Sequence, residues 1–371
     1  MTLPEVRIAI VGYGSIARSH VSALQALPAV RALRVRPVIA AIVTERPDAV
    51  RDEAAALGVG RVVTSLDEAL AGGDLDLVDV TGRNDQHAAA VEAALAAGCA
   101  AYVEKPIGRI PEEAATLAAL AEASARPSQA GLVMRYDPAI VGARALLRLG
   151  AIGDVRQGRM GSFHGSYLDP RRPISWRLRR ETAGGGAMLD LGLHLIDAAR
   201  FLLGDGRLER SAARTVVGAR PTADGGTASV DVDDWAWAEL AHGDARVTIE
   251  ASRIAYGAEG TPLELFGSEG SLVADLRRGA LTLHRFDGRE GEFRREAAAD
   301  PWVRAVDDLR PPARLTLGAF VDLHAAALHH VMRRVLGDDP APGLAPTLAD
   351  SAAAEALAAA VTAELQVQVR P

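Results

Sequence analysis

The first 125 residues alternate short apolar runs with longer stretches in which apolar positions recur every three or four residues. The short runs predict buried strands, and the longer stretches predict helices with one apolar face. The predicted strands are Val6–Val11, Val38–Val43, Arg61–Thr64, Leu75–Thr81 and Ala100–Glu104. The predicted helices are Ser15–Leu27, Asp48–Leu57, Leu66–Ala71, Gln86–Ala97 and Pro111–Ala125. This regular alternation predicts a doubly wound parallel sheet in an α/β domain.

After residue 128 the strand-like segments follow one another without intervening helices, joined by short turns that contain Gly or Asp. This pattern predicts a large, open and mostly antiparallel sheet, preceded by a last strand of the first sheet at Ser128–Val133. The strands predicted for the second sheet are Val155–Phe163, Ala212–Val217, Val232–Leu240, Ala245–Ala251, Pro262–Phe266, Ser271–Ala274 and Ala280–His284. The remaining predicted segments are a helix over Met188–Leu203, an irregular polar surface segment over Asp287–Pro312, and closing helices over Phe320–Leu336 and Leu348–Val367. We therefore expect one domain over residues 1–130 and a second, α+β domain over residues 131–371.

Composition narrows the class of protein. A length of 371 residues agrees with two domains, and a net charge of −7 argues against a nucleic-acid-binding surface. One local arginine cluster fits either a solvated loop or a contact for an anion or substrate: Arg171, Arg172, Arg177, Arg179 and Arg180. The single cysteine cannot form an intramolecular disulfide, and no uncharged apolar stretch reaches the roughly 18–20 residues that cross a bilayer. We expect a soluble cytoplasmic protein without a signal peptide.

A glycine loop follows the first predicted strand directly and opens a helix. It reads Gly12-Tyr13-Gly14-Ser15-Ile16-Ala17. Gly12 suits a tight turn, Gly14 lets the backbone approach a pyrophosphate, and the helix N-terminus supplies amide donors. The loop therefore predicts a dinucleotide site, although a glycine-rich turn that binds nothing would look the same.

The end of the second predicted strand bears on the choice between NAD and NADP. NAD-binding proteins of this class place an acidic residue there to bind the ribose hydroxyls. This sequence has Thr44-Glu45-Arg46 instead. Thr44 leaves room for a 2′-phosphate that Arg46 can pair with, whereas Glu45 can bind the hydroxyls of NAD. We expect NAD(P)(H), with a slight preference for NADP(H).

Lys105 is the only lysine in the chain, so 40 of the 41 basic residues are arginine. Lys105 suits a chemical role that arginine cannot fill. The alternative is that one lysine remains by chance in an arginine-rich sequence. Lys105, Gly12, Thr44 and Thr81 each fall just beyond the carboxyl end of a different predicted strand. Ligands of open α/β sheets bind at that edge, so we expect Lys105 to lie near a nicotinamide ring.

A second candidate cluster lies in the Met188–Leu203 helix, just after Gly184-Gly185-Gly186. Asp190, His194 and Asp197 are spaced by four and three residues and therefore share one helix face. His194 is the candidate general base, because the pKa of histidine lies near working pH. Asp190 could orient His194 or bind a substrate hydroxyl. A buried structural histidine and a metal site are the alternatives, the latter disfavoured because no cysteine or second paired histidine accompanies it.

Taken together, these motifs resemble the glucose–fructose oxidoreductase/inositol dehydrogenase family, the Gfo/Idh/MocA family. The matching segments are the glycine loop with His20 after it, Glu104-Lys105-Pro106, Arg135-Tyr136-Asp137-Pro138, and Gly184 through Asp197. The resemblance implies an N-terminal Rossmann domain and a second domain whose open sheet forms homodimer or homotetramer contacts. It also implies that Lys105 and His194 are catalytic, that Asp190 contacts substrate, and that the Lys105–Pro106 bond is cis.

The chain departs from the family pattern after the fourth predicted strand. The usual Thr-Pro-Asn-x-x-His appears here as Thr81-Gly82-Arg83-Asn84-Asp85-Gln86-His87. We expect Thr81, Gly82, Arg83, Asn84, His87 and Glu104 to flank the cofactor. We expect Arg135, Trp176 and Arg177 to contact substrate, although Trp176 could instead be structural.

The predicted function is an NAD(P)-dependent dehydrogenase acting on a secondary alcohol or ketone of a sugar, inositol or related polyol. Lys105 would polarise the substrate oxygen and His194 would act as acid and base. Three alternatives remain at this point: a non-catalytic nucleotide-sensing regulator, an NAD-dependent glycosidase, and an imine reductase.

Overall fold

The computed structural model describes residues 3–30, 32–363 and 365–367, which form two compact units. Unit 1 comprises Met1–Gly108, Glu112–Tyr136 and Arg304–Ala352. Unit 2 comprises Arg109–Pro111, Asp137–Val303 and Ala353–Pro371. Arg304–Ala352 thus belongs to the compact unit of the N-terminal sheet, whereas the expected boundary at residue 130 assigned it to the second domain.

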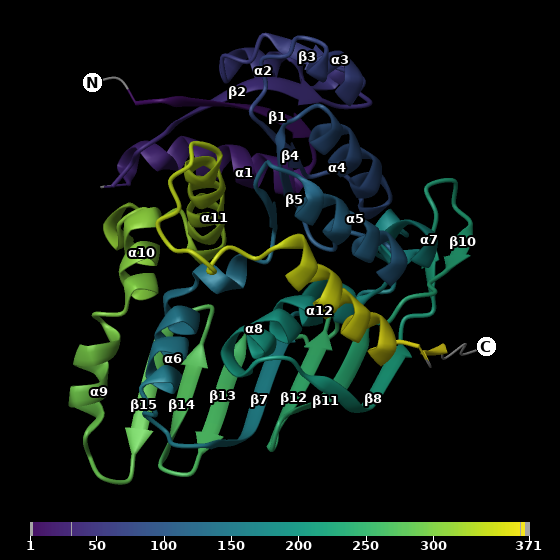
Figure 1. Ribbon diagram of the computed structural model, residues 1–371. Helices are drawn as coiled ribbons and strands as arrows, with labels where there is room; N and C mark the ends of the chain where they lie inside the picture. Colours follow the sequence, from purple (N-terminus) through teal and green to yellow (C-terminus); the bar gives the residue numbers. More distant parts are fainter. Residues whose placement is uncertain (1–2, 31, 364, 368–371) are drawn as a thin grey trace. The chain divides into compact units, whose positions relative to one another are not determined.

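Unit 1 is built on a parallel sheet of six strands in the order β3-β2-β1-β4-β5-β6 (Figure 1). The strands are β1 (Glu5–Val11), β2 (Arg36–Val43), β3 (Arg61–Val63), β4 (Leu77–Val80), β5 (Ala100–Val103) and β6 (Ser128–Ala130). Every residue of β4 and β5 is buried, as expected for central parallel strands. The winding direction reverses between β1 and β4, which are neighbours, so a ligand-binding crevice is expected at their carboxyl ends. The predicted doubly wound sheet is confirmed.

Helices pack against this sheet, and one of them comes from far along the chain. The helices are α1 (Ser15–Ala26), α2 (Arg51–Ala56), α3 (Leu66–Leu70), α4 (His87–Ala96), α5 (Pro111–Ala123) and α11 (Ala319–Val335), with short turns η1 (Leu27–Ala29), η2 (Pro47–Ala49), η3 (Asn84–Gln86), η4 (Val133–Tyr136) and η7 (Ala313–Leu315). Helix α11 lies beside α1 (Figure 1). Gln129 in β6 donates to the carbonyl of Ala327 in α11 at 3.0 Å. This contact and the buried face of α11 explain why the segment belongs to unit 1.

Unit 2 is built on an eight-stranded sheet in the order β15-β14-β13-β7-β12-β11-β8-β16. The strands are β7 (Val155–Phe163), β8 (Arg207–Thr215), β11 (Trp235–His242), β12 (Ala245–Ser252), β13 (Pro262–Gly267), β14 (Gly270–Asp275), β15 (Ala280–Arg285) and β16 (Gln366–Val367). Neighbours are antiparallel except for β7 with β12 and β8 with β16. Buried and half-buried residues alternate along β12, because one face of the sheet is covered. The expected mostly antiparallel sheet is confirmed.

Helices α6 (Pro138–Arg148), α8 (Leu193–Leu203) and α9 (Glu290–Ala297) pack on this sheet. The other elements of unit 2 are η5 (Trp176–Leu178), α7 (Arg180–Ala183), η6 (Met188–Gly192) and a small ladder of β9 (Ala219–Pro221) and β10 (Thr227–Ser229). Helices α10 (Pro301–Leu309) and α12 (Leu348–Val361) each have residues in both units. Helix α8 packs on β7 and β12.

Two secondary-structure predictions were wrong. The segment Asp287–Pro312 contains α9 and α10 rather than irregular chain. The last helix ends at Val361 instead of Val367, and Gln366–Val367 pairs with β8 as β16. The polar sequence of α9 hides its helical character, because Ala297 is the one buried residue of this helix.

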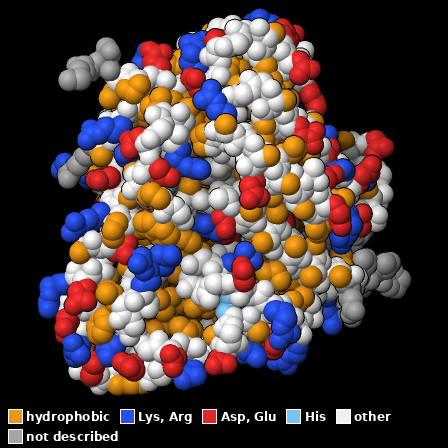
Figure 2. Space-filling view, viewed as in Figure 1, with side chains coloured by type: hydrophobic (Ala, Val, Ile, Leu, Met, Phe, Trp, Pro, Cys, Tyr) orange, Lys and Arg blue, Asp and Glu red, His pale blue; other side chains and the backbone are white. Residues whose placement is uncertain are grey.

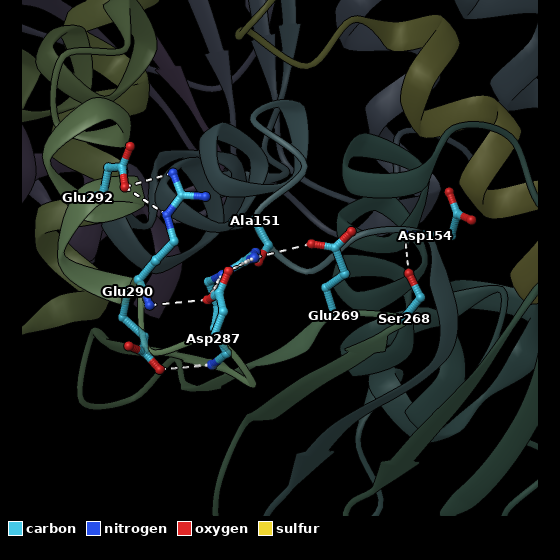
Figure 3. Close-up of polar contacts among 9 residues, drawn as sticks. Ala151, Asp154, Ser268, Glu269, Asp287, Glu290 and Glu292 are labelled. Carbon is cyan, nitrogen blue, oxygen red and sulfur yellow. Dashed lines mark hydrogen bonds and ion pairs between the residues drawn. The ribbon is translucent and has the colours of Figure 1, made fainter.

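Arg285 is the last residue of β15, and Figure 3 labels the residues that its polar groups contact, Ala151, Glu269, Asp287 and Glu290. Arg285 donates to the carbonyl of Ala151, to Glu269 at 3.1 Å, and to Asp287 at 2.6 Å. The Glu290 carboxylate accepts from the Arg285 backbone amide at 2.9 Å. These bonds fix the turn from which α9 begins.

Basic and acidic side chains are interspersed over the face drawn in Figure 2, without a large patch of one sign. Among the described residues, no helix combines the length and the apolar character that crossing a bilayer requires.

Candidate functional site

The glycine loop joins β1 to α1 in unit 1. Gly12 has a positive φ of 80°, and a Cβ placed on it would lie 2.5 Å from the Cα of Gly82. Gly14 is the N-cap of α1 and supplies no side-chain acceptor to the first helical amides, whereas a Cβ placed on it meets no atom within 4 Å. The loop therefore leaves helix N-terminal donors and open space beside Gly14, an arrangement that fits a dinucleotide pyrophosphate.

Replacing Gly12 with alanine is expected to destabilise the protein by about 2 kcal/mol or more, because the left-handed conformation and the contact with Gly82 both disfavour a Cβ. The matched variant Gly14→Ala should keep the melting temperature and weaken cofactor binding. Thermal unfolding and fluorescence titration with NADH and NADPH measure both effects. An unchanged melting temperature for Gly12→Ala would contradict the assignment.

Tyr13 ties the glycine loop to α2. Its hydroxyl donates to Glu53 at 3.1 Å, and Arg18 donates to the same carboxylate at 2.9 Å. Burial, followed by the neighbouring Glu53 carboxylate, raises the pKa of Tyr13 to about 12. Tyr13 is thus a neutral donor at physiological pH that holds the loop in place.

The residues after β2 are the candidates for ribose recognition. Thr44 accepts a hydrogen bond from the backbone amide of Arg46 at 3.3 Å. Glu45 accepts from the side-chain amide of Gln86 at 3.1 Å. The carboxylate that would bind the ribose hydroxyls of NAD therefore already has a protein donor.

The loop after β4 lies beside the glycine loop. The Thr81 hydroxyl donates to the carbonyls of Val11 and Gly12 at 3.0 and 2.9 Å. Arg83 makes a two-pronged pair with Asp85, with both contacts at 3.0 Å. Arg83, which was expected to flank the cofactor, is thus paired within the loop, and Asn84 begins η3.

His87 connects this loop to the residue after Lys105. Its Nδ1 lies 2.7 Å from the Pro106 carbonyl, and its Nε2 lies 3.2 Å from the Gly82 carbonyl. Burial lowers the pKa of His87, so the ring is neutral, and the shorter contact places its proton on Nδ1. His87 thereby supports the backbone on both sides of the candidate cofactor site.

Lys105 lies just beyond the carboxyl end of β5, on the same sheet edge as Gly12 beyond β1 and Thr81 beyond β4. The Glu104 backbone amide donates to the Val80 carbonyl at 2.9 Å, which continues the sheet up to the lysine. The Lys105–Pro106 bond is cis, as the family resemblance implied.

A buried ion network lies next to Lys105. His20 Nδ1 contacts the two Asp79 carboxylate oxygens at 2.9 and 3.0 Å, and its Nε2 lies 3.3 Å from Glu104 Oε1. His324 Nδ1 lies 3.9 Å from the same Glu104 oxygen. Burial alone would lower the pKa of His20, but Asp79 and then Glu104 outweigh it and raise the pKa to about 10. Burial likewise acts against the charged form of Glu104, yet His20 and His324 lower its pKa to about 2.

Three of these residues, His20, Glu104 and His324, place candidate metal-ligand atoms within 4.8 Å of one another. A metal ion requires an unprotonated Nε2 on His20. Asp79 and Glu104 raise the pKa of His20 and so favour its imidazolium, which lies between the two carboxylates. These contacts favour an ion network that positions Glu104, and with it the backbone of Lys105.

In unit 2, Asp233 organises the glycine triplet before η6. Its carboxylate accepts from the backbone amides of Gly186 at 2.9 Å and Met188 at 2.8 Å. A Cβ on Gly186 would lie 2.0 Å from the Asp233 carbonyl oxygen, so the close approach requires glycine here. The segment Met188–Gly192 is a π-helical turn, a feature that often marks functional sites.

Asp190 lies in this turn and His194 in the first turn of α8. Arg253, directly after β12, donates from Nη2 to Asp190 Oδ2 at 2.9 Å. Asp197, which the sequence placed on the same face, is buried in α8. His194 belongs to unit 2 and Lys105 to unit 1, so their meeting over one cofactor stays a prediction.

The other expected substrate contacts have protein partners. Arg135 is buried in η4 and forms an ion pair with Asp350 at 3.2 Å. The Arg177 guanidinium lies over the Trp176 ring, 4.3 Å from its centroid. In the arginine cluster, Arg171 pairs with Asp169 at 2.9 Å, and Arg172 donates to the Ser166 carbonyl at 2.7 Å. These contacts favour the loop interpretation for Arg171 and Arg172.

Several residues of the two clusters were not identified from the sequence: Asp79, His324, Asp233 and Arg253. Asp79 carried a usable signal, since an acidic residue inside the apolar strand β4 needs a buried partner. His324 and Arg253 carried none, because only the fold brings them to their partners.

Comparisons with known proteins agree with this architecture. Residues 6–131 match the family model described as oxidoreductase family, NAD-binding Rossmann fold, and residues 140–273 match the GFO/IDH/MocA C-terminal domain. The chain is 30% identical to 1,5-anhydro-D-fructose reductase of Ensifer adhaerens, over 79% of this chain and 81% of that protein. It is 29% identical to levoglucosan dehydrogenase of Pseudarthrobacter phenanthrenivorans, over 74% and 75% of the two chains.

Solved structures give the same result. An NAD-binding oxidoreductase from Klebsiella pneumoniae superposes with a TM-score of 0.84 at 27% identity, covering 97% of this chain and 96% of that chain. Levoglucosan dehydrogenase in complex with NADH and levoglucosan gives 0.85 at 24% identity with the same coverage, which shows the shared fold. This chain therefore belongs to the Gfo/Idh/MocA family of NAD-binding oxidoreductases.

Proposed function

We propose that this protein transfers a hydride between a nicotinamide cofactor and a secondary alcohol or ketone of a sugar, inositol or related polyol. The observation that carries the proposal is the placement of Lys105 beyond β5, on the sheet edge that also holds the glycine loop and Thr81. Relatives named levoglucosan dehydrogenase, 1,5-anhydro-D-fructose reductase and inositol 2-dehydrogenase support the substrate class.

The chain's own residues would divide the work. The glycine loop and the N-terminus of α1 hold the pyrophosphate, and Glu104 and His87 fix the backbone around Lys105. The Lys105 ammonium donates a hydrogen bond to the substrate oxygen and stabilises negative charge that develops there. The nicotinamide supplies the hydride acceptor or donor.

His194 would move the proton. In the oxidative direction its imidazole takes the hydroxyl proton, and in the reductive direction the imidazolium returns it. Asp190 accepts a hydrogen bond from a substrate hydroxyl and so orients the carbon that carries the hydride.

A substrate screen tests the proposal. Purified protein is mixed with sugars, anhydrosugars and inositols, each with NAD and with NADP, and nicotinamide absorbance is followed. We expect at least one polyol to give sustained production of the reduced cofactor. Glycoside cleavage without a net change in absorbance would contradict the proposal and indicate a glycosidase. Turnover of imines only would contradict it and indicate an imine reductase.

Arg46 is proposed to favour NADP(H) over NAD(H), since Glu45 is bound by Gln86 and Arg46 is exposed after β2. Replacing Arg46 with alanine is expected to raise the KM for NADP about 10-fold or more, the value of a charge-assisted contact to phosphate. The KM for NAD should change less than about threefold by the same reasoning, since NAD lacks that phosphate. Equal effects on both cofactors, or a wild type that accepts NAD alone, would contradict this preference.

We also propose a cytoplasmic homodimer or homotetramer assembled through the eight-stranded sheet. Strand β8, which is followed only by the two-residue strand β16 at this edge of the sheet, leaves many side chains exposed, which supports a contact face there. Light scattering coupled to size-exclusion chromatography would measure the mass, and a monomer would contradict the proposal.

A further inference from the structure

Arg253 is a buried arginine that contacts a proposed substrate-binding residue. It follows β12 directly, its side chain is 1% exposed, and its backbone amide donates to the Asp234 carbonyl at 2.9 Å. Its Nη2 donates to Asp190 Oδ2 at 2.9 Å, while the Asp190 side chain is 31% exposed. One end of this ion pair is therefore fixed inside unit 2, and the other end reaches towards solvent.

The remainder of the guanidinium has weak partners. It lies over the Tyr167 ring, 5.0 Å from the centroid, and within the field of the buried Asp233. Its Nε and Nη1 atoms are buried, and no residue in the described part of the chain accepts a hydrogen bond from them. Burying a charged group whose donors are not all hydrogen-bonded is costly. The ion pair with Asp190 is the interaction that offsets this cost for Arg253.

Arginine suits this position because its planar group is permanently charged and rigid. The Arg253 backbone is held by its bond to Asp234, and its guanidinium lies over the Tyr167 ring. The guanidinium therefore fixes one Asp190 oxygen, and with it the plane of the carboxylate. The sequence left open whether Asp190 orients His194 or binds a substrate hydroxyl. A carboxylate held in one plane by a buried partner is suited to accept from a hydroxyl in a defined direction.

We infer that Arg253 is a positioning residue that acts through Asp190 to orient the substrate's polyol hydroxyls. This inference rests on the proposed function and adds a specificity-determining residue to it. Losing the fixed plane should misplace the reacting carbon, for which small displacements cost up to about 100-fold in rate.

A double-mutant cycle tests the inference. Arg253→Met, Asp190→Asn and the double variant are assayed for kcat and KM with the best polyol from the screen. Arg253→Met is expected to lower kcat/KM about 10- to 100-fold in the wild-type background. In the Asp190→Asn background it should lower kcat/KM less than about threefold, because the residue it positions is already lost. Arg253→Lys, which keeps a donor for Asp190, should recover part of the loss.

Arg220 provides a matched control. Its side chain is equally buried at 1% exposure and lies 5.9 Å from the same Tyr167 ring, but it donates to the carbonyls of Asp169 and Tyr167. Arg220→Met should lower the melting temperature without coupling to Asp190→Asn. If Arg253→Met lowers kcat/KM equally in both backgrounds, as a purely structural residue would, the inference is overturned.

A crystal structure of apo Arg253→Met separates this inference from the proposed function. If the wild type oxidises no polyol, the proposed function is wrong, and the crystal structure of Arg253→Met alone tests the positioning role of Arg253. A displaced Asp190 carboxylate supports the positioning role, and an unmoved one overturns it. Where Arg253→Met does not fold, Arg253→Gln, which also removes the charge that pairs with Asp190, replaces it in both experiments.

Discussion

Replacing Lys105 with methionine is expected to lower kcat by about 10³-fold or more while cofactor binding changes little. Methionine keeps the length and apolar stem but cannot donate a hydrogen bond to the substrate oxygen. Removing a donor that stabilises a developing oxyanion costs about 10²–10³ in kcat, and the loss grows when proton transfer is also affected. Stopped-flow turnover and fluorescence titration with reduced cofactor measure the two quantities.

Lys105→Arg is the sharper variant, because it keeps the positive charge. Its planar fork is larger than an ammonium group and differs in hydrogen-bond geometry, so we expect a low kcat here too. Full activity of Lys105→Met would remove Lys105 from the mechanism, and loss of cofactor binding together with the melting temperature would indicate a structural residue.

Replacing His20 with glutamine is expected to cost about 3–5 kcal/mol of the free energy of unfolding, because it leaves the buried Asp79 and Glu104 carboxylates without their cation. The loss should depend on pH. Since folding raises the pKa of His20 from 6.5 to about 10, its contribution is complete below pH 6.5 and is lost as pH rises through about 10. Glu104 acts in the opposite range: its pKa falls from 4.5 to about 2, so its contribution is lost as pH falls through that value.

Urea unfolding of the wild type and His20→Gln at pH 6, 8 and 10 should therefore show a difference that shrinks with rising pH. The groups that face His20 are Asp79, Glu104, Tyr102 and His324. His329 in α11 is the matched control, because it is equally buried but burial lowers its pKa to about 4. His329→Gln should destabilise the protein without this alkaline dependence, and the same pH profile for both variants would contradict the ion network.

The pattern of apolar residues predicted the two sheets because strands such as β5 are short apolar runs between clear turns. It failed where local sequence and tertiary contacts disagree. Helix α9 has Glu and Arg at most positions and few buried residues, so its periodicity is faint. Pro301 at the start of α10 was an available helix signal that the polar surroundings obscured.

The sequence predicted those parts of the candidate site whose residues lie close together along the chain. The glycine loop and Glu104-Lys105-Pro106 are contiguous, and each follows a recognisable strand. The partners that fix these segments are distant: His324 reaches Glu104 across 220 residues, and Arg253 reaches Asp190 across 63. No periodicity in one sequence encodes such pairs, because each depends on how separate elements pack.

Lys105 is the sole side-chain amine of the sequence, and it lies at the edge of the parallel sheet. Growth on ¹⁵Nζ-labelled lysine would therefore give a protein with a single labelled side-chain nitrogen. Magnetic resonance could follow the charge on that nitrogen directly as cofactor and substrate are added. Amine-directed reagents would likewise report on this one position, apart from the chain's α-amino group.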